Sequence, residues 1–263
     1  MDQVLHEENY KQWNGLSEKY HNDRPKPPDV IVQIILSWLQ REPDTVVDVG
    51  CGTGLSTVIW NGIAKEIVGI EPNDDMRSTA IDNYDSENIS FITGVSNDTG
   101  LPSNYTDIIT VSQAFHWMDI NSTLFEFYRI LKPGGILAIY DFVLPPVCDW
   151  EIEKTNLEMR EKFSNIVYSQ ERPPVHNDKD TYNDRIKSFG KFRFTRKVEC
   201  HNTLFMTPLK LADFLIGISN ACFAIKTDPS LSKDLDDFYN FVKAKYENDI
   251  EVLLPYKLVM AVK

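Results

Sequence analysis

Short apolar runs alternate with longer amphipathic segments through the first half of the chain. The run at residues 45–49, Thr-Val-Val-Asp-Val, is rich in β-branched residues and almost continuously apolar, which is typical of a strand buried on both faces of a parallel sheet. Similar runs follow at residues 66–71, 89–93, 107–112 and 136–141. Helical patterns separate these runs at residues 55–65, 74–83 and 122–131. The alternation predicts an α/β fold with a doubly wound parallel sheet and a ligand crevice at the carboxyl edge of its strands.

Proline and glycine mark the boundaries of this region. Pro25, Pro27 and Pro28 break the chain before a helix expected at residues 30–40, for which Asp29 is the expected cap. A turn is expected at residues 132–135, Lys-Pro-Gly-Gly.

The pattern changes after residue 142. Residues 142–192 contain Pro145-Pro146, Pro173-Pro174 and a charged helical stretch at 151–168, and we interpret them as an insertion that covers the crevice. The C-terminal part predicts strands at 194–201 and 252–262 and helices at 209–218 and 233–248. We therefore expect one domain over residues 1–263, in four parts: an N-terminal helical cover (1–44), a cofactor-binding half (45–141), the insertion (142–192) and C-terminal strands and helices (193–263).

The most informative motif is Asp-Val-Gly-Cys-Gly-Thr-Gly at residues 48–54, between the first strand and the next helical pattern. Glycines at such a place let the backbone turn sharply and approach a ligand closely. A dinucleotide loop would need glycine or alanine three residues after its second glycine, where this chain has Leu55 or Thr57. No Gly-Lys-Ser/Thr follows either, so the loop is not that of a nucleotide triphosphatase.

An acidic residue completes the pattern. Glu71 stands 21 residues after Gly50, at the end of the second predicted strand, where a carboxylate accepts hydrogen bonds from both hydroxyls of a ribose. Loop and acid together indicate an adenosine-bearing ligand without a pyrophosphate. The alternative is that the glycines only form a tight turn and that Glu71 is a solvated strand end.

Several stretches resemble the class I S-adenosylmethionine-dependent methyltransferases, and more narrowly the methyltransferase type 11 group with the trans-aconitate and ubiquinone-biosynthesis enzymes. The matching stretches are residues 46–54, 69–76, 101–102, 110–117 and 131–135, with a weaker match at Tyr20 and Arg24-Pro25. The resemblance implies a Rossmann-like seven-stranded sheet with helices on both faces and an antiparallel last strand. It also implies S-adenosyl-L-methionine as the cofactor.

The resemblance also implies a role for each matching residue. Asp48, Gly50, Cys51, Gly52 and Gly54 would form the loop around the methionyl part, and Glu71 would hold the ribose. Pro72 and Met76 would pack near the adenine, with Ser96 and Asn97 at its border, although the acid that the family often has there stands one place later, at Asp98. Gln113 and Ala114 would lie beside the sulfonium, His116 and Trp117 on the substrate side, and Arg24 with Tyr20 at the cofactor carboxylate.

The expected function is methyl transfer from S-adenosyl-L-methionine to a small organic acceptor, with a carboxylate preferred. A carboxylate needs no base and no metal, whereas a phenol, hydroxyl or acidic carbon would use His116 as the catalytic base. The alternative for His116 is a packing role against Trp117. Methylation of nucleic-acid bases is disfavoured, because the fourth strand is followed by Gln-Ala-Phe-His rather than by an Asn/Asp-Pro-Pro-Tyr/Phe or proline-cysteine motif. A quinone, phenol, protein or RNA acceptor, or a binding module without catalysis, stays open.

The composition of the chain bears on its partners and on its location in the cell. The net charge is −12, which disfavours nucleic acid as a partner. Four widely spaced cysteines indicate reduced thiols, and the acidic N-terminus and a longest apolar stretch of only Val30–Leu39 indicate a cytoplasmic protein with no signal peptide and no membrane span. The basic stretch from Arg185 to Lys197 is either a solvated face or an anion-binding lip. Trp13, Trp38, Trp60 and Trp150 are expected to pack, as are Phe189, Phe192 and Phe194, and the oligomeric state is not indicated.

Overall fold

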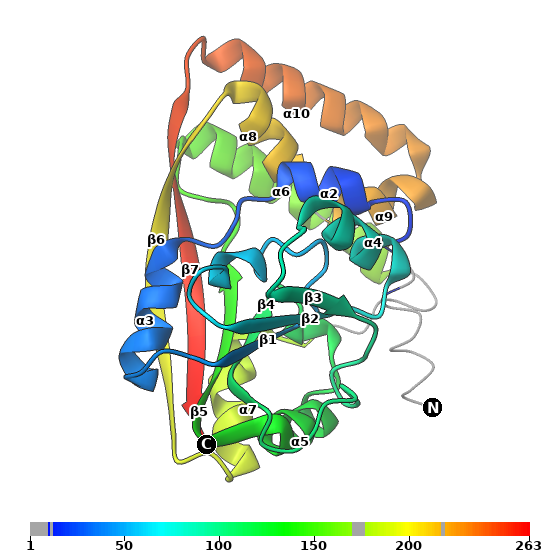
Figure 1. The fold of residues 1–263 in the computed structure, drawn as a ribbon. Helices are drawn as coiled ribbons and strands as arrows, with labels where there is room; N and C mark the ends of the chain where they lie inside the picture. The colour runs from blue at the N-terminus through cyan, green and yellow to red at the C-terminus, as the bar shows by residue number, and fades with distance from the viewer. Residues whose placement is uncertain (1–9, 11–12, 170–176, 217–218) are drawn as a thin grey trace.

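The computed structural model describes Tyr10 and residues 13–169, 177–216 and 219–263 (Figure 1). The acidic stretch 1–8 and Pro173-Pro174, on which two of the expectations rested, lie outside the described residues.

A seven-stranded sheet forms the centre of the fold, in the order β3-β2-β1-β4-β5-β7-β6. Its strands are β1 (Thr45–Val49), β2 (Glu66–Ile70), β3 (Ile89–Ile92), β4 (Thr106–Ser112), β5 (Leu131–Phe142), β6 (Phe194–Met206) and β7 (Ile250–Val262). The neighbours from β3 to β5 pair in parallel, whereas β7 is antiparallel to both β5 and β6. The expected seven-stranded sheet with its antiparallel last strand is confirmed.

Side chains of the central strands alternate between two buried cores. In β1, Val46 joins a core with α3 (Asp29–Leu39), while Val47 joins the core on the other face with α5 (Ile120–Ile130) and α7 (Tyr182–Phe189). Every residue of β1 is buried, which explains why its sequence is almost continuously apolar.

The remaining helices lie mainly at the carboxyl edge of the parallel strands. Figure 1 shows α6 (Trp150–Tyr168), α8 (Pro208–Ile216), α9 (Ser219–Thr227) and α10 (Ser232–Lys245) gathered at the upper end, where the long strands β6 and β7 run past the short central strands. The helices α2 (Ser17–Asp23) and α4 (Asp74–Asn83) contact each other at the same end. The layer over this edge therefore includes segments that come between β6 and β7 in sequence, in addition to α6 from the expected insertion.

Most predicted elements coincide with observed ones, with three corrections. The helix expected at 55–65 is wrong, because the chain forms turns around a short 3₁₀ helix at Val58–Trp60. The run from Ser56 to Ile59 consists of Ser and β-branched residues, which are poor helix formers. Asp29 is the first residue of α3 rather than its cap, a position occupied by Pro28. The turn expected at 132–135 is instead an irregularity within β5, whose register passes from Thr106↔Leu131 to Ile108↔Ile136.

Two further expectations change. Trp150 was expected to pack, but it is 71% exposed at the start of α6, whereas Trp60 is fully buried. The basic stretch from Arg185 forms α7, which packs beside α5, followed by the start of β6. Phe189 and Phe192 join the core on that face, as expected, while Phe194 is 55% exposed and lies against Trp38.

Candidate active site

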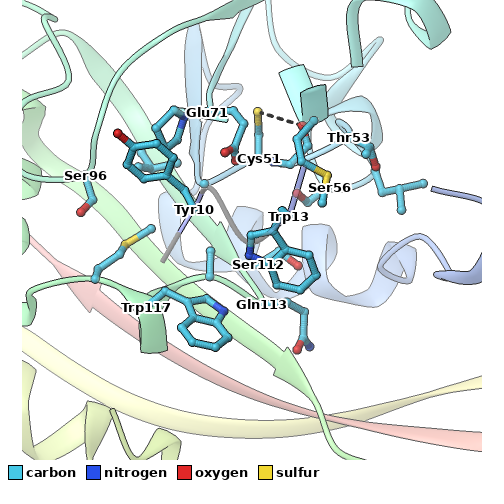
Figure 2. A pocket seen from close by; sticks show the side chains of 18 of the residues that line it. Tyr10, Trp13, Cys51, Thr53, Ser56, Glu71, Ser96, Ser112, Gln113 and Trp117 are labelled. Atoms are coloured by element: carbon cyan, nitrogen blue, oxygen red, sulfur yellow. Dashed lines mark hydrogen bonds between the residues drawn. The ribbon is translucent and has the colours of Figure 1, made fainter. Parts of the chain in front are cut away.

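A cavity of about 490 Å³ opens where β1, β2 and β4 end (Figure 2). We call it the first cavity. Its walls include most of the residues expected to bind a cofactor, namely Tyr20, Arg24, Gly50, Cys51, Gly52, Glu71, Pro72, Met76, Ser96, Asn97, Gln113 and Ala114. Trp117, which was expected on the substrate side, also lines this cavity. The loops that follow several parallel strands thus meet at one place, which is where ligands bind in sheets of this type.

The glycine loop forms one wall of the first cavity. Gly50 has φ +70°, and a Cβ atom there would lie 2.7 Å from the Cβ of Ala114, so no side chain fits. Gly52 has φ +56°, but a Cβ atom there would meet nothing within 4 Å. Gly52 therefore leaves open space beside the loop, as a site that receives a ligand against its backbone requires.

Glu71 is held rigidly on the adjacent wall. One carboxylate oxygen accepts from the backbone N–H of Gly52 at 2.9 Å, and the other accepts from the N–H of Asn73 at 2.9 Å. Burial raises the pKa of Glu71 to about 7, although these two N–H groups act in the opposite direction. Because a carboxylate has about four acceptor positions, two remain for a ligand.

Cys51 lies beside Glu71 in Figure 2 and is buried. Burial, with the nearby Glu71 and Asp48 charges, raises the pKa of its thiol well above the usual value. The thiol is therefore protonated near neutral pH and contributes packing rather than a nucleophile.

Asp48 does not line the first cavity. Its side chain is fully buried, and its oxygens accept from the hydroxyls of Ser56 at 2.6 Å, Thr57 at 2.7 Å and Thr110 at 2.8 Å. Burial raises its pKa in spite of the three hydroxyl donors. Asp48 therefore ties β1 to β4 and to the segment after the glycine loop, and its contribution to a ligand site is through the position of that loop.

The N-terminal segment covers the first cavity. Tyr10, Trp13, Tyr20 and Arg24 all line it, and the Trp13 ring meets the rings of Tyr20 and Trp117 edge-on at centroid distances of 5.6 and 6.5 Å. The Arg24 guanidinium lies over the Tyr20 ring at 4.8 Å. Trp13 was expected only to pack against other side chains, and it also forms part of the wall of the first cavity.

Gln113 stands at the boundary between this cavity and a neighbouring one. It follows β4 directly and has φ +54°, an unusual conformation for a residue other than glycine. Its Oε1 accepts from the Lys179 ammonium at 3.2 Å. In Figure 2, Gln113 and Trp117 lie across the cavity from Glu71 and Cys51.

The neighbouring cavity, which we call the second cavity, has a volume of about 440 Å³. Six residues line both cavities: Trp13, Tyr20, Arg24, Gln113, Trp117 and Phe142. Further residues of the second cavity come from β5, α6, α7 and the strands β6 and β7. The two cavities therefore adjoin each other across a shared wall.

His116 lines the second cavity and not the first. Its side chain is 8% exposed, and its Nδ1 lies 3.9 Å from a carboxylate oxygen of Asp141. Asp141 also pairs with Lys179 at 2.8 Å. The His116 ring lies 5.0 Å from that of Trp117, so it combines contact with Trp117 and a place on the wall of the second cavity.

Of the sequence-predicted site residues, Asp48, Gly54 and His116 lie outside the first cavity. A Cβ atom on Gly54 would instead meet the rings of Tyr84 and Phe91. The cavity-lining residues that sequence reasoning missed include Arg160, Ser164 and Tyr168 on α6. No local signal identified them, because charged residues on an amphipathic helix usually face solvent.

Comparison with known proteins gives consistent results. Residues 47–139 match the model of a methyltransferase domain family. A relative from Dictyostelium discoideum, described as a methyltransferase, is 31% identical over 132 residues, which are 50% of this chain and 49% of that protein. A relative from Saccharomyces cerevisiae, described as an S-adenosylmethionine-dependent methyltransferase, is 27% identical over 146 residues, which are 54% of this chain and 50% of that protein. The matches thus span about half the length of these relatives.

The fold agrees over a longer range. A solved structure from Anaeromyxobacter dehalogenans, described as a type II methyltransferase, has a TM-score of 0.70 and 16% identity, and the match covers 91% of this chain and 97% of that one. Residues 47–139 therefore match a methyltransferase domain, and the sheet that contains them has the class I methyltransferase fold. Among the described residues, no helix is both long enough and apolar enough to span a bilayer.

Proposed function

We propose that this chain transfers a methyl group from S-adenosyl-L-methionine in the first cavity to a small organic acceptor in the second. The observation that carries the proposal is the shared wall, where Gln113 and Trp117 face both cavities. A donor and an acceptor that are held next to each other in adjoining cavities react as if they were parts of a single molecule. This positioning is the main contribution of the protein to such a displacement.

The residues of the first cavity suit the parts of the cofactor. Glu71 has two acceptor positions left for the ribose hydroxyls, and Gly52 leaves room for the methionyl part beside the loop. The Arg24 guanidinium can form a fork with the cofactor carboxylate. Pro72 and Met76 offer an apolar wall for the adenine. When bound, the cofactor supplies an electrophilic methyl group whose leaving group is a neutral thioether.

Ser96 and Asn97 also belong to the wall of the first cavity and are proposed to border the adenine. The Ser96 hydroxyl lies 2.7 Å from that of Thr123. Asp98 lies outside this wall, so its carboxylate is not assigned to the exocyclic amino group.

The acceptor is proposed to be small, because the second cavity holds about 440 Å³. A carboxylate is the preferred acceptor, in agreement with the finer resemblance to the trans-aconitate methyltransferases. A carboxylate is already nucleophilic at neutral pH, so with such an acceptor His116 is not needed as a base and would orient the acceptor or pack against Trp117. For a phenol, a hydroxyl or an acidic carbon, His116 is the proposed base, and a carboxylate oxygen of Asp141 lies 3.9 Å from its Nδ1.

Macromolecular acceptors are less well supported. The net charge of −12 disfavours RNA, and the size of the second cavity favours a whole small molecule over a segment of a protein.

Two measurements test the proposal. Calorimetry with S-adenosyl-L-methionine and its demethylated product, S-adenosylhomocysteine, should detect binding of both. Incubation with methyl-labelled cofactor and separate sets of small organic acids, phenols, peptides and RNA should then label a small molecule only. Tight binding without transfer to any acceptor would favour a binding module, and the absence of cofactor binding would refute the proposal altogether.

A further inference from the structure

The second cavity is basic, although the chain as a whole is acidic. Among the described residues that line it are five cations, Arg24, Arg160, Lys179, Lys197 and Lys257, and two anions, Asp141 and Asp180. This excess of positive charge in a chain of net charge −12 is a local feature. A concave site with one dominant sign of charge concentrates ligands of the opposite sign.

The two carboxylates of the second cavity are already paired. Lys179 lies 2.8 Å from Asp141, and Lys257 lies 2.5 Å from Asp180. Lys197 is more exposed and pairs with Glu199 at 3.2 Å. These ion pairs balance the three lysines, whereas Arg160 forms no ion pair within the described part of the chain.

Arg160 lies on α6, one turn before Ser164 and two turns before Tyr168, and all three line the second cavity. Its Nη1 is buried, and within the described part of the chain that atom has no hydrogen-bond partner. Burial, and next the charge of Arg24, lower the pKa of Arg160. A buried guanidinium without a counter-charge is costly unless a ligand supplies one.

Other polar atoms of the second cavity also lack partners among the described residues. They include Nε2 of Gln113, which is a donor because Oε1 of the same amide accepts from Lys179, and the Tyr182 hydroxyl, which can donate or accept. One acceptor, Oδ1 of Asn183, also belongs to this set. With Arg160, the cavity thus presents mainly donors. Oxygen-rich anions, which only accept, satisfy such a set of donors.

We infer that Arg160 binds an anionic group of the acceptor, a carboxylate or a phosphate, while Arg24 is left to the cofactor carboxylate. This inference rests on the proposed function only in taking the ligand of the second cavity to be the methyl acceptor. A guanidinium fork engages both oxygens of a carboxylate, and Arg160 lines the second cavity but not the first. The atom that receives the methyl group therefore belongs to another part of the molecule, nearer the shared wall, and the acceptor is a bifunctional organic acid.

The test uses calorimetry on the complex with S-adenosylhomocysteine. The probes are pairs of similar shape that differ in charge, namely glutarate with glutaramide and isophthalate with isophthalamide, together with phenyl phosphate as the phosphate arm. We expect at least one anionic probe to bind and its neutral partner to bind at least about tenfold more weakly. Comparison of the carboxylate and phosphate arms identifies the anion.

Variants assign the effect to one side chain. Arg160→Gln should weaken the anionic probe about tenfold to a hundredfold, and Arg160→Lys, which keeps the charge but loses the fork, should weaken it less. Lys154→Gln, on the exposed side of the same helix, is the matched control and should change nothing. Affinity for S-adenosylhomocysteine should be unchanged in all three variants, which also shows that they fold. Removal of the buried charge should in addition raise the melting temperature of the ligand-free protein in Arg160→Gln.

Three results would overturn the inference while leaving the proposed function intact: no binding of any anionic probe to the cofactor-bound wild type, equal binding of neutral and anionic probes, or unchanged anion affinity in Arg160→Gln. Loss of S-adenosylhomocysteine binding in the wild type would instead refute the proposed function, so the two failures are distinguishable.

Discussion

Replacement of Glu71 by glutamine tests the assignment of the first cavity most directly. The variant keeps the size of the side chain but removes its charge and one of its two acceptor oxygens. The structure leaves one acceptor position on each oxygen, because the N–H groups of Gly52 and Asn73 occupy the others. Loss of a hydrogen bond to a charged acceptor costs roughly 1.5–3 kcal/mol. We therefore expect the dissociation constant for S-adenosylhomocysteine to rise by about thirtyfold, which corresponds to about 2 kcal/mol, and by at least as much in Glu71→Ala.

The pH dependence gives a second, independent readout. The pKa of Glu71 is raised to about 7, so in the wild type the carboxylate takes up a proton as the pH falls through that value and loses acceptor capacity. Affinity should therefore fall below pH 7, by up to about tenfold per pH unit, and this dependence should be absent in Glu71→Gln.

The stability of the ligand-free protein should decrease as the pH rises, whereas the affinity for the ligand should increase. The ordinary pKa of 4.5 applies to the unfolded chain, and the folded value is about 7. The unfolded chain thus binds fewer protons between these values, and the free energy of unfolding should decrease as the pH rises from about 4.5 to about 7, by about 3 kcal/mol in total. Glu71→Gln should lack this component of the pH dependence.

Calorimetry over a pH series and urea denaturation measure these quantities. Glu66→Gln, at the exposed start of the same strand, is the control for an equal change of charge. Wild-type affinity in Glu71→Gln, or wild-type affinity that increases as the pH falls below 7, would refute the ribose assignment.

The remaining predictions concern the loop, its support and His116. Gly50→Ala should lower the melting temperature and weaken S-adenosylhomocysteine binding at least about tenfold, because the new Cβ would lie 2.7 Å from that of Ala114. The control is Gly62→Ala, at a position with a similar φ of +78° where a Cβ atom would meet nothing within 4 Å. Equal effects of the two substitutions would contradict the steric argument. Asp48→Ala should lower the free energy of unfolding in urea by about 3 kcal/mol, because three buried hydroxyls lose their acceptor. A urea midpoint equal to that of the wild type would show that the three hydrogen bonds are dispensable. His116→Ala should abolish labelling of hydroxyl acceptors but not of carboxylates, with cofactor affinity intact in the same calorimetric assay, and retained activity on hydroxyl acceptors would assign His116 to packing.

Local order along the chain was sufficient to predict the parallel strands of the sheet and the glycine loop after the first of them. The strand at 45–49, its glycine loop and the acid after the second strand lie within about 25 residues, and each depends on backbone geometry that short sequence patterns encode. The helix predicted at 74–83 has the observed bounds, because Asn73 accepts from the N–H of Met76 and caps it. The helix expected at 55–65 failed where β-branched residues and the bonds of Ser56 and Thr57 to Asp48 outweighed an apolar pattern.

Such short sequence patterns could not predict the second cavity. Its walls join residues from β5, α6, α7, β6 and β7, and the same composition of α6 would suit a helix with Arg160 in solvent. The basic stretch from Arg185 to Lys197 drew attention in the sequence, yet only Lys197 of its cations lines the cavity.

The sequence by itself determined the sheet, the glycine loop and the identity of the acid beside it, since these depend on residues close together in the chain. Only the tertiary structure decided that Asp48 is withdrawn from the first cavity, that Trp13 belongs to its wall, and that Nη1 of Arg160 is buried and feels the charge of Arg24. The reason is that burial of a charged side chain depends on which distant elements pack around it, and the periodicity of a single helix carries no record of those neighbours.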